Sequence, residues 1–360
     1  MKIKLLFFIF CGITFPILLS AQLSKGTWLV NGRFDFTSWK NLDKRFSNNS
    51  PQSDVLVLPQ VSFFISSRFQ VNGELTISLL NKNTIVGQKL GGRFYFNNES
   101  NNRFFTGLVL GWARRRSIFA TGGFTTQTFQ TRLDFGLNHF FNENVALEFL
   151  AKYVFLDIIK SQPIEAPIRV NNGGISLRWE MQYFFKSELS NDPANQERNF
   201  KRGMWMLGGS ATLGNTGVEN VSFQIDRSTN YISPLAAYFL NEHWAVGTYF
   251  NYSNDLRYRQ FNITWSPMIR YYLNLNYKKK IFGEVRLGLG MDIIRINDQW
   301  NATNNILRPE LKLGVANMLS KYVSLDVWIN YQETKTNEFY SLNRKTRQIG
   351  VHMGLQAYID

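Results

Sequence analysis

The residues with the most evident chemical potential are three histidines and a set of carboxylates, which are the groups that general acid–base catalysis uses. His139 and His243 fall at expected turns, and His352 falls on the polar face of the last extended segment. Catalysis would need such groups to converge on one site, and these three do not. The sequence also contains no phosphate-binding loop and no metal-ligand motif. We therefore expect neither an enzyme nor a bound cofactor, and we expect His352 to be a hydrogen-bonded interior residue.

The carboxylates are better explained as ion-pair partners, because arginines and lysines share their positions. Successive residues of a strand point to opposite faces, and here one face is charged while the other is apolar. In the first half of the chain, the polar face carries Arg33, Asp35, Glu74, Lys89, Arg93, Arg132, Asp134, Glu148, Lys152, Arg178 and Glu180. In the second half it carries Arg270, Glu284, Arg286, Asp292, Arg308, Glu310, Lys312 and Asp326.

Exclusion of charge from the apolar face indicates that this face meets lipid. An Arg or Lys on the lipid face costs about 2–4 kcal/mol at the middle of a membrane. A soluble β-sandwich is the alternative, but it would need a very large core to bury so many aromatic-rich faces. The polar sets are nearly balanced in charge, and an eight-stranded barrel is just wide enough to be filled by side chains. Since isolated buried ions are costly, we expect ion-pair networks that plug narrow lumens.

The strands that must position these residues belong to an internal repeat of roughly 175–178 residues, which occurs twice in the chain. Gly26-Thr27-Trp28 returns as Gly203-Met204-Trp205, and Arg93-Phe94-Tyr95 returns as Arg270-Tyr271-Tyr272. We divide the chain into a signal peptide (1–21), a first copy (22–185), a linker (186–201) and a second copy (202–360). The first copy is predicted to contain strands at 26–36, 55–66, 69–80, 88–96, 103–113, 127–138, 144–156 and 173–185. The second is predicted to contain strands at 203–214, 229–240, 243–253, 260–273, 280–291, 305–317, 321–332 and 346–359.

The connections alternate in length, which predicts the topology. Short turns such as Ser66-Ser67-Arg68 and Asn241-Glu242-His243 alternate with longer connections such as residues 114–126. Outer-membrane barrels keep short turns in the periplasm and long loops outside. The fold class is therefore all-β: a transmembrane antiparallel up-and-down β-barrel, as two tandem eight-stranded barrels or alternatively one sixteen-stranded barrel. Both termini would face the periplasm.

The first residues predict export. Lys2 and Lys4 precede an apolar core from Leu5 to Leu19, and Leu19-Ser20-Ala21 before Gln22 is a plausible cleavage site. Cys11, the one cysteine of the chain, lies within that core, so the mature protein would contain no thiol. No later apolar run approaches the ~20 residues of a spanning helix. We expect a bacterial outer-membrane location.

Basic residues predominate, with 40 Lys and Arg against 26 Asp and Glu. An exported protein rarely meets nucleic acid, so the anionic outer-membrane lipid, above all lipopolysaccharide, is the expected partner. Arg114, Arg115 and Arg116 at the outer mouth of the fifth strand are either a solvated loop or a contact for lipopolysaccharide phosphates. No more specific partner can be inferred from the sequence.

Each copy resembles the small OmpA/OmpX-like or "porin family" outer-membrane β-barrel domains. The residues that carry the resemblance are the opening Gly-x-Trp, Ile232-Ser233-Pro234, Tyr238-Phe239, Val246-Gly247, Arg270-Tyr271-Tyr272 and Phe282-Gly283-Glu284. The first copy departs at Ser62, Asn72 and Thr106. Family members usually end on an aromatic residue, whereas here Tyr358 is followed by Ile359 and Asp360. The resemblance implies insertion by the barrel-assembly machinery.

Two functions fit these observations. The first is a structural or surface-interaction protein whose lumens are plugged by charge networks. The alternative is a porin-like channel for small solutes. The linker and the balanced lumen charges favour the first.

Overall fold

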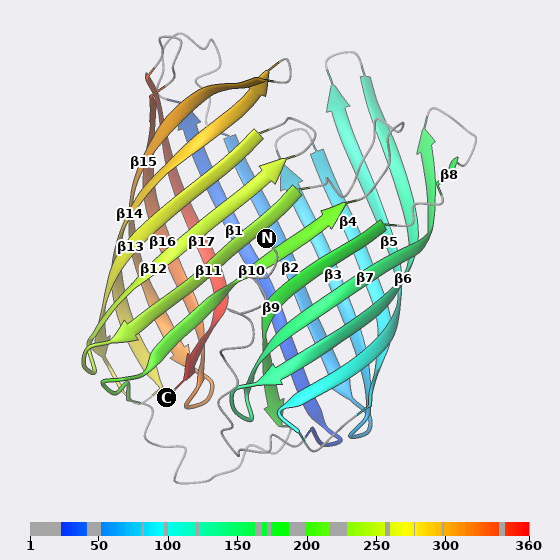
Figure 1. Ribbon diagram of the computed structural model, residues 1–360, viewed down its shortest axis with the longest axis horizontal. Coiled ribbons are helices and arrows are strands. Elements are labelled where there is room, and N and C mark those ends of the chain that lie inside the picture. Colours follow the sequence, from blue (N-terminus) through cyan, green and yellow to red (C-terminus); the bar gives the residue numbers. More distant parts are fainter. Residues whose placement is uncertain are drawn as a thin grey trace, which may run out of the picture.

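The computed structural model describes residues 23–41, 52–80, 83–96, 100–119, 122–162, 168–170, 174–186, 199–215, 229–255, 260–276, 278–296, 299–337 and 343–359. They form seventeen strands (Figure 1). In the first copy these are β1 Thr27–Asn41, β2 Gln52–Phe64, β3 Phe69–Leu80, β4 Asn83–Tyr95, β5 Asn102–Phe119, β6 Gly122–Phe140, β7 Val145–Gln162, β8 Ile168–Val170 and β9 Gly174–Lys186. In the second copy they are β10 Trp205–Asn215, β11 Thr229–Phe239, β12 Trp244–Asp255, β13 Gln260–Asn274, β14 Lys279–Ile296, β15 Gln299–Met318, β16 Val323–Asn337 and β17 Asn343–Ile359. No helix with the length and apolarity of a membrane span occurs in the described ranges.

All sixteen predicted strands are present, and β8 is an additional short strand paired with β7. Most strands run further than predicted at the end that carries the long connections. β5 continues to Phe119 and β7 to Gln162, whereas the apolar alternation ends near residues 113 and 156. The extra residues include polar ones such as Thr125 and Thr126 of β6, which keep their ladder partners. Backbone pairing, not side-chain hydrophobicity, sets where these strands end.

The short turns are built by side chains that cap the backbone. Asn241 Oδ1 accepts hydrogen bonds from the amides of His243 and Trp244, each at 2.9 Å. Asn142 does the same for Asn144 and Val145, at 2.9 and 3.0 Å. Such Asx turns are a property of the local sequence. They lie at one end of the strands, which we call the turn end; the other is the loop end.

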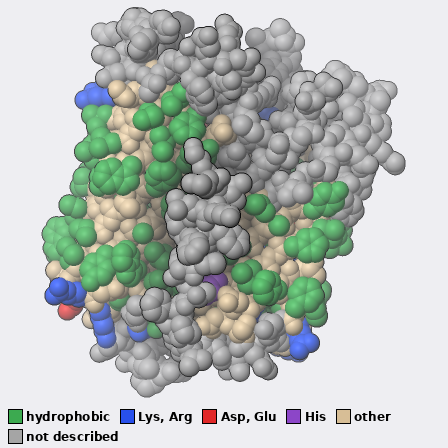
Figure 2. Space-filling view, in the orientation of Figure 1, with side chains coloured by type: hydrophobic (Ala, Val, Ile, Leu, Met, Phe, Trp, Pro, Cys, Tyr) green, Lys and Arg blue, Asp and Glu red, His purple; other side chains and the backbone are tan. Residues whose placement is uncertain are grey.

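The two faces of the strands differ as predicted. On β14, Glu284 is 1% exposed and Arg286 8% exposed, whereas Val285 and Leu287 between and beyond them are 59% and 43% exposed. Figure 2 shows hydrophobic side chains spread over the outer surface of both halves. The polar side chains are enclosed and the apolar ones face outward, which is the reverse of a soluble protein and is the arrangement of a transmembrane barrel.

At the turn end, the strands close as two separate eight-stranded rings. β1 pairs with β9, from Thr27 opposite Lys186 to Val30 opposite Tyr183. β10 pairs with β17, from Trp205 opposite Ile359 to Leu207 opposite Ala357. The prediction of two eight-stranded barrels is confirmed by these closures.

Toward the loop end, the same four strands exchange partners. β1 leaves β9 and pairs with β17, from Arg33 opposite Gly354 to Asn41 opposite Thr346. β10 leaves β17 and pairs with β9, from Ser210 opposite Glu180 to Asn215 opposite Ile175. The two barrels therefore share a continuous wall in this half of the molecule (Figure 1). Two rings at the turn end merge into one ring of sixteen strands.

The exchange occurs at four two-residue steps, which we call the strand-exchange junction: 31–32 in β1, 181–182 in β9, 208–209 in β10 and 355–356 in β17. At these steps the strands lack a partner only on the edge where the partners change. Three glycines, Gly32, Gly208 and Gly209, lie within it. Glycine inside a strand permits a tight bend. β9 and β17 are the last strands of the two copies and occupy equivalent places in the repeat. Each therefore presents a similar edge, and β1 and β10 can each pair with either of them.

Below the junction, the outer walls of the two barrels pack against each other. Val145, Met181 and Tyr183 of the first copy form one buried cluster with Val323 and Ala357 of the second. The strand alternation places Met181 and Tyr183 on the lipid face, but they are only 7% and 4% exposed. That part of the prediction is wrong, because the other barrel covers this stretch of wall in place of lipid.

Candidate functional site

The lumen of the first barrel contains a compact ion-pair network. Arg93 on β4 lies 2.6 Å from Glu148 on β7 and 3.8 Å from Asp134 on β6. Arg132 binds Asp134 at 2.6 Å. Arg93 also lies over the ring of Phe105, 4.5 Å from its centroid. All four charged side chains are buried, so the predicted network is present and links three strands across the lumen.

Two further ion pairs between polar-face residues lie nearer the junction. Lys89 donates to Glu74 at 2.9 Å, and Arg178 pairs with Glu180, which also accepts from Gln182 at 2.8 Å. The side chains of Arg33 and Asp35 lie outside the described residues. Their backbones pair with Gly354 and His352 of β17.

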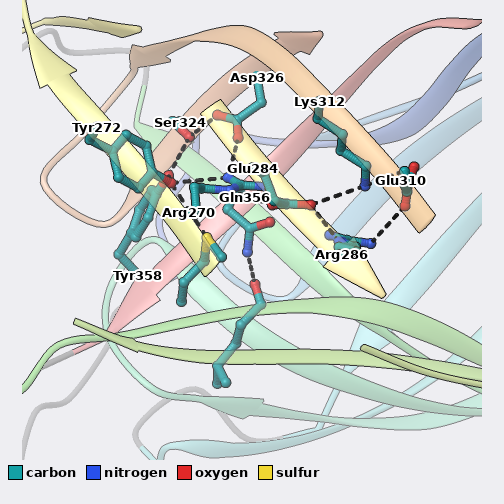
Figure 3. Close-up of polar contacts among 12 residues, drawn as sticks. Arg270, Tyr272, Glu284, Arg286, Glu310, Lys312, Ser324, Asp326, Gln356 and Tyr358 are labelled. Atoms are coloured by element: carbon teal, nitrogen blue, oxygen red, sulfur yellow. Dashed lines mark hydrogen bonds and ion pairs between the residues drawn. The ribbon is translucent and has the colours of Figure 1, made fainter. Parts of the chain in front are cut away.

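The second lumen contains a larger network (Figure 3). Glu284 contacts three cations: Arg270 at 2.5 Å, Lys312 at 3.3 Å, and Arg286. Arg270 also binds Asp326 at 3.2 Å. Glu310 lies 3.5 Å from Lys312 and 4.0 Å from Arg286. Of the eight charged residues that the sequence places on the polar face of the second half, these six form one network.

The two networks share one ion pair at equivalent positions of the repeat, but they differ in the order of charges on the equivalent strands β6 and β15. Arg93 with Glu148 and Arg270 with Asp326 occupy equivalent places in the repeat. By contrast, Arg132 and Asp134 of β6 correspond to Glu310 and Lys312 of β15, so the order of charges is reversed. Glu284 and Arg286 on β14, where the first copy has Gly107 and Val109, supply the charges that the reversed order requires.

An aromatic plug closes each barrel at its turn end. In the second barrel, Phe200 is 1% exposed, and its ring centroid lies 4.4 to 4.7 Å from those of Phe239, Tyr272 and Tyr358. In the first barrel, Leu23 occupies the equivalent place among Phe64, Tyr95, Phe140 and Phe184. Sequence reasoning missed both plug residues and assigned Phe200 to the linker. The available signal was the repeat itself, since Leu23 and Phe200 each stand three residues before the equivalent glycines Gly26 and Gly203.

Those two glycines direct the chain from the plug into the first strand of each barrel. Gly26 has φ +87° and Gly203 φ +101°, a left-handed conformation that L side chains rarely adopt. The glycine of the Gly-x-Trp motif that opens each copy is thus a requirement of the backbone.

A cavity of about 650 Å³ adjoins the network of the second barrel and spans the junction. The first copy contributes Arg178, Glu180 and Tyr183 to its wall, and the second copy contributes most of the rest, including Tyr249, Arg286 and Arg308. Asparagine, glutamine and hydroxyl side chains make up much of the remaining lining. The two lumens communicate through this cavity.

The histidines lie where the sequence predicts. His352 faces the second lumen, 2.8 Å from Asn330 Oδ1 and stacked on Trp328 with ring centroids 5.5 Å apart. His139 and His243 are at the turn end, where ring nitrogens contact Asn102 Oδ1 at 2.7 Å and the Tyr272 carbonyl at 2.9 Å. Within the described ranges, no group of acidic, histidine or cysteine side chains could hold a metal ion.

The arginine triplet is part of β5 and not of a loop. Arg114 and Arg116 are exposed and share the outer face with Leu108, Leu110 and Trp112, whereas Arg115 points inward. The two outer arginines therefore lie immediately beyond the apolar band of the strand, on its loop-end side.

The fold and lumen together define a transmembrane β-barrel of the outer-membrane type. No protein-family model and no curated protein sequence matches the chain. Among solved structures, it is similar to a TodX monoaromatic hydrocarbon channel mutant (9% identity, TM-score 0.39, 94% of this chain and 92% of that chain). It is also similar to a bacterial polysaccharide outer membrane secretin (10%, 0.42, 92% and 97%) and to a Pseudomonas aeruginosa FadL homologue (9%, 0.34, 93% and 89%). At such low identities and TM-scores, these likenesses carry nothing about function.

Proposed function

We propose that this protein is a non-conducting outer-membrane barrel with a structural or surface-interaction role. The observation that carries the proposal is the double closure of each lumen in the described residues: an aromatic plug at the turn end and a buried ion-pair network next to it. An ion crossing either barrel would have to displace both layers. The proposed role is not enzymatic.

The porin-like channel is the second candidate, and the merged ring with its cavity of about 650 Å³ favours it. Conductance in planar lipid bilayers separates the two. We expect the purified full chain to insert without stable current steps, with a general porin in the same bilayers as the positive control. Reproducible steps of uniform size from the protein would establish the channel instead.

The proposal includes export and orientation. Residues 1–22 lie outside the described residues, so cleavage after Ala21 remains a prediction, to be tested by N-terminal sequencing of protein from isolated outer membranes. The start of β1 and the end of β17 both lie at the turn end, which supports periplasmic termini. Descent from the OmpA/OmpX-like family and insertion by the barrel-assembly machinery likewise remain proposals.

We propose lipopolysaccharide as the lipid partner, with Arg114 and Arg116 contacting its phosphates. Their place beyond Trp112 on the outer face of β5 supports this, because a basic side chain near an anionic lipid surface gains about 1 kcal/mol. Replacing both arginines by alanine should weaken binding to lipopolysaccharide micelles several-fold. Arg115→Ala is the matched control, since that side chain points inward. Equal affinities for the parent and the double variant would contradict this contact.

A further inference from the structure

Arg308 on β15 differs from the cations that neighbour it in the second lumen. Arg286 and Lys312 each lie within 4.0 Å of a carboxylate. Among the described residues, no carboxylate lies within that distance of Arg308, and its buried Nε has no hydrogen-bond partner. The nearest acid along its strand, Glu310, is already bound by Lys312 and by Asn330 at 3.0 Å. Arg308 therefore makes no close ion pair at the loop-end side of the network, although the carboxylates of Glu310 and Asp292 act on it from further away.

The Arg308 side chain lines the shared cavity, and several neutral polar groups line it as well. Tyr249, Asn251, Thr264, Ser266 and Gln332 line the cavity with it. Gly288 is directly opposite Arg308 in the ladder. A Cβ at that position would lie 3.1 Å from the Arg308 Cβ and 3.2 Å from Ser266 Oγ, so glycine keeps the space beside the arginine open.

A partly enclosed cation that makes no close ion pair is costly, and arginine presents a planar set of donors that matches a carboxylate or a phosphate. The surrounding hydroxyl and amide groups can donate to and accept from the hydroxyls of a solute. The cavity volume lies within the usual range of small-molecule sites, about 300–1,000 Å³. Charged and hydrogen-bonding side chains form most of its lining, which favours a polar ligand.

We propose that the shared cavity binds a small hydroxylated solute that carries one carboxylate or phosphate group, and that Arg308 holds this group. Both groups present the same oxyanion chemistry to the guanidinium. This inference goes beyond the proposed function, because a non-conducting barrel and a channel could equally contain such a site.

Calorimetric titration of the folded protein in detergent tests the proposal with glucuronate, glucose 6-phosphate, inorganic phosphate and glucose as probes. We expect glucuronate or glucose 6-phosphate to bind. Glucose lacks the anionic group and so loses the charge-assisted hydrogen bond to Arg308, and it should bind at least about tenfold more weakly. The preferred probe identifies the carboxylate or the phosphate as the recognised group. Inorganic phosphate as tight as glucose 6-phosphate would show that the hydroxyls contribute nothing, and would overturn the solute class.

Arg308→Gln should reduce the affinity for the preferred probe by about tenfold or more and should fold, because this side chain takes part in no ion pair of the network. Arg308→Lys keeps the charge without the planar donor set, and we expect a smaller loss. Arg68→Gln, at an exposed turn remote from the cavity, is the control and should bind as the parent does. Failure of both anionic sugars to bind, or unchanged affinity in both Arg308 variants, would refute the site.

Discussion

Tyr183 of the first copy donates a hydrogen bond to the backbone carbonyl of Leu355 of the second copy, at 3.0 Å and 172 positions away in the sequence. The bond spans the strand-exchange junction. Tyr183 is 4% exposed, and a buried phenol needs a hydrogen-bond partner. The two barrels are therefore joined by specific contacts at the point where their strands change partners.

The partner exchange can be tested by cross-linking. Ala211 of β10 is opposite Trp179 of β9, and paired strands hold Cα atoms within disulfide range. The double variant Trp179→Cys, Ala211→Cys should form a disulfide on oxidation, detected by mass spectrometry of peptides from outer membranes.

The matched control for this cross-link pairs Ala211→Cys with Met353→Cys. If β10 followed β17 along its whole length in the register seen at the turn end, residue 353 would be the partner of residue 211. A disulfide in this control, and none between positions 179 and 211, would mean two fully separate barrels.

Removing Glu284 should destabilise the second barrel strongly. Glu284→Ala leaves Arg270, Arg286 and Lys312 without their shared carboxylate, and breaking a buried ion pair typically costs about 3–5 kcal/mol. Leu287→Ala should cost less, because Leu287 is 43% exposed on the lipid face and lipid can fill the space. Urea unfolding in liposomes measures both. A stable Glu284→Ala variant beside a weakened Leu287→Ala variant would mean that the two faces are reversed.

Substitution of Arg103, unlike that of Glu284, should not destabilise the protein. Arg103 is 0% exposed, its three guanidinium nitrogens have no hydrogen-bond partner in the described part of the chain, and it lies over Phe140 at 5.1 Å. Arg103→Met removes an unsatisfied buried charge but keeps most of the volume, so we expect unchanged or higher stability in the same urea assay. Arg93→Met, which breaks the bond to Glu148, should be clearly destabilising. Equal losses in both variants would show that Arg103 is held by an ion pair or hydrogen bond.

Gly203 should be intolerant of alanine because of its backbone conformation. A Cβ at Gly203 would meet no atom within 4 Å, so any cost of Gly203→Ala comes from its φ of +101°, about 1–2 kcal/mol for an L residue. Gly283→Ala is the control, since Gly283 also has free space and lies in an ordinary strand. Thermal unfolding monitored by gel mobility should show a loss for the first variant and little for the second.

The sequence by itself determined the features that depend on near neighbours. The alternation around Glu284 and Val285 established which face is enclosed, and the turn residues Asn142 and Asn241 marked the reversals. The repeat favoured two rings over one ring of sixteen strands, and the near balance of charge on the polar faces indicated ion-pair networks. These are local properties of strands, because side-chain direction has a period of two residues.

Only the tertiary structure decided how the two copies are joined. Since β9 and β17 are equivalent edges, the sequence cannot indicate where β1 leaves one for the other; that depends on how the two closed rings pack and bend. For the same reason, Met181 and Tyr183 have the pattern of lipid-facing residues, yet they contact the other barrel. That Arg308 makes no close ion pair is likewise invisible in the charge-balanced set of polar-face residues. It arises because ion pairing depends on distances across the lumen, and those distances leave this side chain lining the shared cavity.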